Sequence, residues 1–61
     1  MLIPSYREIL KKLKNERWVL ERRRGSHKQF SKDGRRITVS GEGNNQPSSG
    51  EWNDIRKKAG W

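Results

Sequence analysis

The dipeptide Asp33-Gly34 is the feature that most limits what this chain can fold into. Asp-Gly is strongly favoured in two-residue β-hairpin turns of type I′, because such a turn needs positive φ at both central positions. If these two residues form the turn, Lys32 pairs with Arg35. The count outward along both strands then puts Phe30 opposite Ile37. One short motif therefore predicts both a hairpin and its register.

The predicted register separates the two faces of the hairpin, because side chains alternate along a strand. Phe30, Ile37 and Val39 share one face, and as apolar residues they predict that this face is covered by the rest of the chain. The polar side chains share the opposite, open face: His27, Gln29, Ser31, Arg36 and Thr38. The same count puts His27 opposite Ser40. We therefore expect the only histidine of the chain on a solvent-facing surface.

A first helix is predicted ahead of the strands. Its apolar positions have the spacing of an amphipathic helix and are Tyr6, Ile9, Leu10 and Leu13. Ser5 followed three residues later by Glu8 predicts a capping box at the start of the helix. We expect Asn15 to end it.

A second helix is predicted over residues 52–59, where the apolar stripe consists of Trp52, Ile55 and Ala59. Ser48 and Glu51 form a second candidate capping box ahead of it. Gly60 stands where a left-handed helix end is favoured, and Trp61 is expected to fold back onto the last turn. Because Trp18, Trp52 and Trp61 all fall at apolar positions of the pattern, we expect them to pack in the protein rather than stack on bases.

The order of the predicted elements gives the fold class. Residues 18–20 predict a first strand, Arg24-Gly25 is a candidate turn after it, and residues 41–46 read as a polar loop. We predict a single α+β domain over residues 1–61, with the order α-β-β-β-α and two helices on one face of a three-stranded antiparallel sheet. A chain of 61 residues buries only a thin core, and no cysteine is present to reinforce it.

The charge of the chain indicates its partner. The formal net charge is +8, and most of it comes from residues 17–36, which hold eight basic side chains against Glu21 and Asp33. A concentrated positive patch attracts polyanions, and we rank nucleic acid ahead of an anionic membrane surface. No apolar run approaches the roughly 20 residues of a membrane span, so we expect a cytoplasmic protein without membrane contact. With a single histidine and no cysteine, we expect neither a metal site nor a cofactor.

A histidine among cations permits one kind of chemistry in particular. An imidazole that removes the proton of an RNA 2′-hydroxyl, beside cations that stabilise the charged phosphate, can cleave RNA without a metal. DNA lacks that hydroxyl and would resist. The residues alone also allow His27 to be a phosphate contact or a bystander.

The stretch from Trp18 to Phe30 resembles the HicA-type toxins, which are small bacterial mRNA interferases. The matching positions are Trp18, Arg22, Gly25, Ser26, His27 and Phe30, and the likeness continues through residues 36–39 and the last helix. The resemblance implies a fold like that of double-stranded-RNA-binding domains, His27 as the catalytic residue, and a HicB-type antitoxin that covers the site. The chain departs from the family pattern at Arg17, where many members have glycine, and at residues 40–42, where many have proline and histidine.

The leading prediction is therefore a toxin that cleaves mRNA, with His27 as its catalytic residue. The predicted RNA contacts are Arg22, Arg23, Arg24, Ser26, Lys28 and Arg36. Ser26 either orients the imidazole or touches the substrate. The alternative is a non-catalytic RNA-binding module with the same fold, and a third is a protein-interaction domain that docks an acidic partner.

Overall fold

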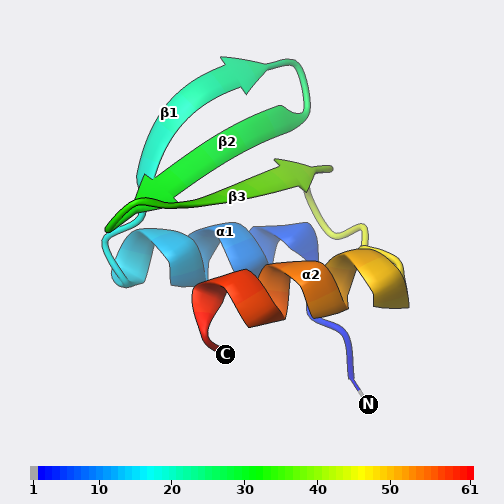
Figure 1. The fold of residues 1–61 in the computed structure, drawn as a ribbon. Helices are drawn as coiled ribbons and strands as arrows, with labels where there is room; N and C mark the ends of the chain where they lie inside the picture. The colour runs from blue at the N-terminus through cyan, green and yellow to red at the C-terminus, as the bar shows by residue number, and fades with distance from the viewer. Residues whose placement is uncertain (1) are drawn as a thin grey trace.

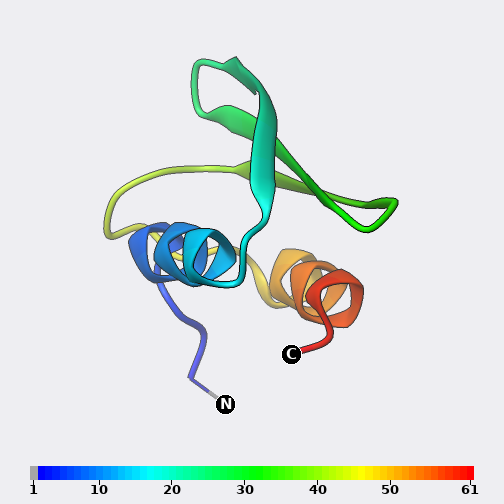
Figure 2. The same ribbon diagram turned by 90° about the vertical axis from the view of Figure 1, so that its left-hand side faces the viewer.

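The computed structural model describes residues 2–61 and contains five elements (Figure 1). They are α1 (Tyr6–Asn15), β1 (Val19–Arg24), β2 (His27–Lys32), β3 (Arg35–Ser40) and α2 (Ser49–Ala59). The strands form one antiparallel sheet in the order β1-β2-β3, and both helices lie on the same side of it (Figures 1 and 2). The predicted α-β-β-β-α order is confirmed.

The β2–β3 hairpin has the register that its turn predicted. Asp33 and Gly34 have φ angles of 51° and 80°, as a type I′ turn requires. Lys32 pairs with Arg35, Phe30 with Ile37, and His27 with Ser40. Phe30 and Ile37 are almost completely buried, so the apolar face of this hairpin does point toward the helices.

The β1–β2 hairpin contains an irregularity that the sequence did not reveal. Leu20 pairs with Phe30, but Arg22 pairs with Gln29, so Glu21 is the extra residue of a β-bulge. From Arg22 to the turn, each β1 residue therefore stands opposite a different partner than an unbroken ladder from Leu20 would give it. This shift decides which arginines share a face with the histidine.

The core fills the space between the sheet and the two helices. Its fully buried side chains come from both helices and from strands β2 and β3. They are Ile9, Leu13, Phe30, Ile37, Val39 and Ile55. Trp18 and Trp52 are 5% and 9% exposed, and Trp61 packs against Trp52 with the ring centroids 6.1 Å apart. The tryptophans therefore belong to the packing of the domain, as predicted, although Trp18 precedes β1 rather than opening it.

The two helix starts differ, and one prediction about them is wrong. At α1 the capping box is complete, because the Ser5 side chain accepts from the Glu8 amide and the Glu8 side chain returns to the Ser5 amide. At α2 the Ser48 hydroxyl accepts from the Glu51 amide, but the Glu51 carboxylate does not return to Ser48. It instead accepts a hydrogen bond from the Tyr6 hydroxyl at 2.7 Å. The carboxylate therefore ties α2 to α1 rather than completing its own cap.

Both helices end in the same motif, a left-handed residue followed by a buried or half-buried tryptophan. After α1, Arg17 has φ 67° and the Trp18 amide donates back to the Leu13 carbonyl. After α2, Gly60 has φ 78° and the Trp61 amide donates back to the Arg56 carbonyl. Gly60 confirms the predicted helix end. Arg17 adopts the left-handed conformation at the position where many members of the family that the chain resembles have glycine.

Replacement of Arg17 by glycine should stabilise the domain. A side chain in the left-handed region costs about 1 kcal/mol, and glycine removes that cost. We expect Arg17→Gly to raise the melting temperature by about 5 °C, measured by circular dichroism, given the size of the domain. Gly60→Ala is the matched reverse experiment and should lower it. An unchanged or lower melting temperature of Arg17→Gly would show that the arginine side chain stabilises the turn.

Because of its single tyrosine, the free energy of unfolding of the protein should decrease in the alkaline pH range. Burial, together with the hydrogen bond to Glu51 and the charge of that carboxylate, raises the pKa of Tyr6 from 10.0 to about 12. Because the folded pKa is the higher one, this stabilisation is complete below about pH 10 and is lost as pH rises through about 12. Phenolate absorbance should titrate near 12 in the folded protein and near 10 in denaturant. Tyr6→Phe should lose this part of the pH dependence of unfolding; a folded-state midpoint near 10 would contradict the prediction.

Candidate functional site

The open face of the sheet carries two rows of polar side chains that run across all three strands. One row consists of Arg22, Gln29 and Thr38, and the other of Arg24, His27 and Ser40. Both rows lie on the face opposite Phe30, because their positions alternate with it along β2. The ladder thus brings two arginines from β1 alongside the histidine from β2.

Most of these side chains, though not Ser40, border an open hollow of about 220 Å³ on the sheet. Its lining residues are Arg22, Arg24, His27, Lys28, Gln29 and Thr38. A larger hollow of about 410 Å³ lies along α1 between Arg7, Leu10, Lys11, Lys14 and Gly43, but it contains no side chain that exchanges protons near neutral pH. The hollow around the histidine is therefore the candidate site for chemistry.

His27 is exposed and has one defined partner. Its Nδ1 lies 3.0 Å from the hydroxyl oxygen of Ser40, the residue opposite it in the ladder. The hydroxyl can donate to Nδ1 or accept from Nδ1–H, according to the tautomer of the ring. When it accepts, Nε2 keeps the lone pair with which it can take a proton. Within residues 2–61, Nε2 has no hydrogen-bond partner. The geometry suits a general base whose ring orientation is set by Ser40.

Ser40 is the residue that the sequence analysis did not single out as part of a site. The signal was present, because the Asp33-Gly34 register already put it opposite His27. Ser26, which was expected to orient the imidazole or touch the substrate, contributes its carbonyl oxygen to a hydrogen bond from the Gly41 amide at 3.1 Å. The hydroxyl on the imidazole belongs to Ser40.

The predicted RNA contacts do not all lie on the histidine face. Arg22 and Arg24 lie there, whereas Arg23 pairs with Lys28 in the intervening row, which faces the helix side. Lys28 still borders the hollow. Arg36 is on the open face, where its Nε lies 3.9 Å from a Glu21 carboxylate oxygen. Both side chains of that pair are largely exposed, so the pairing adds little stability and leaves Arg36 available to an anion.

The electrostatic character of the hollow is cationic. In the described part of the chain, neither Arg22 nor Arg24 has a carboxylate within ion-pair distance. Unpaired guanidinium groups bind phosphate oxygens through two parallel hydrogen bonds. No group of three His, Asp or Glu side chains in residues 2–61 could hold a metal ion. The hollow therefore combines one exposed imidazole with fixed positive charge, a combination that suits an anionic ligand.

Comparison with known proteins adds one finding. A family model described as the HicA toxin of bacterial toxin-antitoxin systems matches residues 6–61, which include all five elements of the fold. No curated protein and no solved structure matches the chain. Within the described residues, neither helix has the length and hydropathy needed to cross a membrane.

Proposed function

Because the chain belongs to the HicA family of toxins in bacterial toxin–antitoxin systems, we propose that it acts by cleaving messenger RNA at the hollow around His27. The observation that carries this proposal is the hydrogen bond between His27 Nδ1 and Ser40 on an exposed, cationic face. It holds the imidazole of an exposed residue by Nδ1, beside Arg22 and Arg24, and no hydrogen-bond partner of Nε2 is present among residues 2–61.

The proposed chemistry uses the nucleophile that RNA itself contains. His27 Nε2 takes the proton of a ribose 2′-hydroxyl, and the resulting oxygen attacks the adjacent phosphorus atom. The bond from phosphorus to the 5′ oxygen of the next nucleotide then breaks, and that oxygen takes a proton from water. The hydroxide that remains takes the proton from His27, which restores the water and the neutral imidazole. The products are a 2′,3′-cyclic phosphate and a free 5′-hydroxyl. No step requires a metal ion.

The proposed role of the arginines is to bind and stabilise the reacting phosphate. Negative charge grows on the non-bridging oxygens as the 2′ oxygen attacks, and donors already aimed at that position lower the barrier. Arg22 and Arg24 are the candidates because they share the hollow with His27. The proposed role of Arg36, which lies on the same face, is to bind a neighbouring phosphate.

The proposed protein partner is an antitoxin of the HicB type. Membership in a toxin–antitoxin family implies a partner that neutralises the toxin. An acidic surface laid over the histidine face would meet the unpaired arginines and exclude RNA from the hollow. Inhibition by this route would need no change in the fold of the toxin.

Removal of the imidazole should abolish cleavage while leaving binding. We expect His27→Ala to reduce the cleavage rate by at least about 100-fold, the contribution typical of general acid–base catalysis, and to change RNA affinity by only a few fold. The assay follows a labelled RNA, in parallel with a copy carrying one 2′-deoxynucleotide at the cleaved position. The deoxy copy should bind and stay intact, and cleavage of the all-RNA copy should persist in a chelator. Binding by wild type without any product would support the non-catalytic alternative.

The two faces of β1 allow a matched test of RNA binding. Arg22→Ala and Arg23→Ala remove the same charge from adjacent positions, but only Arg22 lies on the histidine face. We expect Arg22→Ala to weaken RNA binding and to lower the slope of log affinity against log salt by about 0.7, the value for one contact to a single strand. Arg23→Ala should change the slope less. Equal effects of the two substitutions would mean that RNA binding depends on the total charge of the hairpin and not on the face that carries it.

A further inference from the structure

The carboxylate of Glu51 occupies an unusual place for a residue in the third position of a helix. In the equivalent position of α1, Glu8 returns to the amide of its own N-cap residue. Glu51 has the same spacing from its N-cap residue Ser48, but its carboxylate accepts no hydrogen bond from the Ser48 backbone amide. The same molecule therefore shows both arrangements, and the difference needs a cause outside the local sequence.

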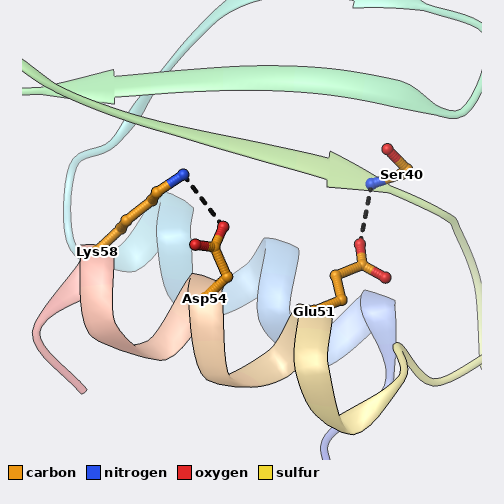
Figure 3. A network of polar contacts seen from close by, with 4 residues as sticks. All are labelled: Ser40, Glu51, Asp54 and Lys58. Carbon is orange, nitrogen blue, oxygen red and sulfur yellow. Dashed lines mark hydrogen bonds and ion pairs between the residues drawn. The ribbon is translucent and has the colours of Figure 1, made fainter.

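The cause is a set of donors at the junction of α1, α2 and β3. One Glu51 oxygen accepts from the Tyr6 hydroxyl at 2.7 Å. The other accepts from the Ser40 backbone amide at 3.5 Å, as Figure 3 shows. A tyrosine hydroxyl is protonated throughout the physiological range even at the ordinary pKa of 10.0, so Tyr6 is the donor in this hydrogen bond. Asp54, one turn later on α2, instead pairs with Lys58 at 3.1 Å (Figure 3).

The ring of Tyr6 also packs against Gly41, the residue after Ser40. A Cβ atom built on Gly41 would overlap the Tyr6 ring, so the backbone of Gly41 lies directly against that ring. The Gly41 amide donates to the Ser26 carbonyl and extends the β2–β3 pairing beyond Ser40. The end of β3 is therefore held from the helix side by Tyr6 and Glu51, and from the sheet side by Ser26.

This arrangement bears directly on the histidine, because Ser40 has two separate contacts. Its amide lies 3.5 Å from a Glu51 carboxylate oxygen, a long hydrogen bond, while its hydroxyl lies 3.0 Å from His27 Nδ1. Ser40 is the last residue of an edge strand, and the Gly41–Ser26 hydrogen bond is the next backbone contact beyond it, so local opening there costs less free energy than in the middle of the sheet. Contacts that prevent this opening also keep the hydroxyl against the ring.

We propose that Glu51 and Tyr6 are positioning residues that fix the end of β3 so that Ser40 accepts the Nδ1–H of His27. The catalytic consequence rests on the proposed ribonuclease function. The effect on the imidazole does not, because it is a property of the free protein. With Nδ1 protonated, Nε2 has the lone pair that a general base needs. When this hydrogen bond is lost, the ring reverts toward the Nε2–H tautomer that free histidine favours, in which the outward-facing nitrogen cannot accept a proton.

The tautomer can be measured directly, because the chain contains one histidine and its ring signals need no assignment. The ¹⁵N chemical shifts of the two ring nitrogens, recorded on the neutral ring, give the ratio of the Nδ1–H and Nε2–H forms. The variants to compare with wild type are Ser40→Ala, Glu51→Gln, Tyr6→Phe and Asp54→Asn. Asp54→Asn is the matched control for Glu51→Gln, because each replaces one α2 carboxylate by an amide of the same shape.

We expect Ser40→Ala to move the tautomer ratio about fivefold toward Nε2–H, the change that the loss of one hydrogen bond produces. Glu51→Gln and Tyr6→Phe should move it part of the way in the same direction, and Asp54→Asn should leave it at the wild-type value. Circular dichroism identifies any variant that does not fold, and Tyr6→Phe, which keeps the ring, then replaces Glu51→Gln. Wild-type tautomer ratios in Glu51→Gln and Tyr6→Phe would overturn the proposal, as would an equal shift in Asp54→Asn.

Kinetics separate this proposal from the proposed function. If the wild type cleaves RNA, Glu51→Gln and Tyr6→Phe should lower kcat by about fivefold or less with KM unchanged, because they touch the base and not the phosphate contacts. A rise in KM with constant kcat would contradict a positioning role. If the wild type does not cleave RNA, the ribonuclease function fails, and the tautomer ratios alone decide whether the positioning role stands.

Discussion

The burial of Phe30 against Ile37 beneath the sheet is the constraint on which the rest of the structure depends. A strand has only two faces, so a residue committed to the core assigns every other residue of its strand to one side or the other. Phe30 thereby places His27 on the solvent side, three positions away along β2. In a domain with so thin a core, few other contacts could hold this assignment.

The β-bulge at Glu21 is the second decisive feature, and it acts on the opposite end of the sheet. An unbroken ladder from Leu20 would put Arg23 opposite His27, whereas the bulge puts Arg24 there. Three consecutive arginines are alike in sequence, and only the ladder distinguishes them. With the bulge, Leu20 pairs with Phe30 while Arg24 still pairs with His27 across the turn that contains Gly25.

The helices do more than cover the sheet. Glu51 gives up the second half of its capping box and instead joins Tyr6 of α1 to the amide of Ser40 at the end of β3. The partner of the histidine is thus connected through the backbone of one residue to both helices. A small domain that places a functional group on its open face can stabilise it in this way, because a strand end is otherwise the part of a sheet that opens most easily.

The sequence by itself determined the element order, the β2–β3 register and the exposed position of His27. Each rests on local chemistry. A type I′ turn needs positive φ, and apolar side chains, which are buried away from water, recur every two residues in a strand and every 3.6 in a helix. Only the tertiary structure decided the bulge at Glu21, the diversion of Glu51 and the contact of Ser40 with the imidazole. These depend on groups far apart in the chain, Tyr6 and Glu51 above all, and on competition between equally good local partners, which no local pattern records.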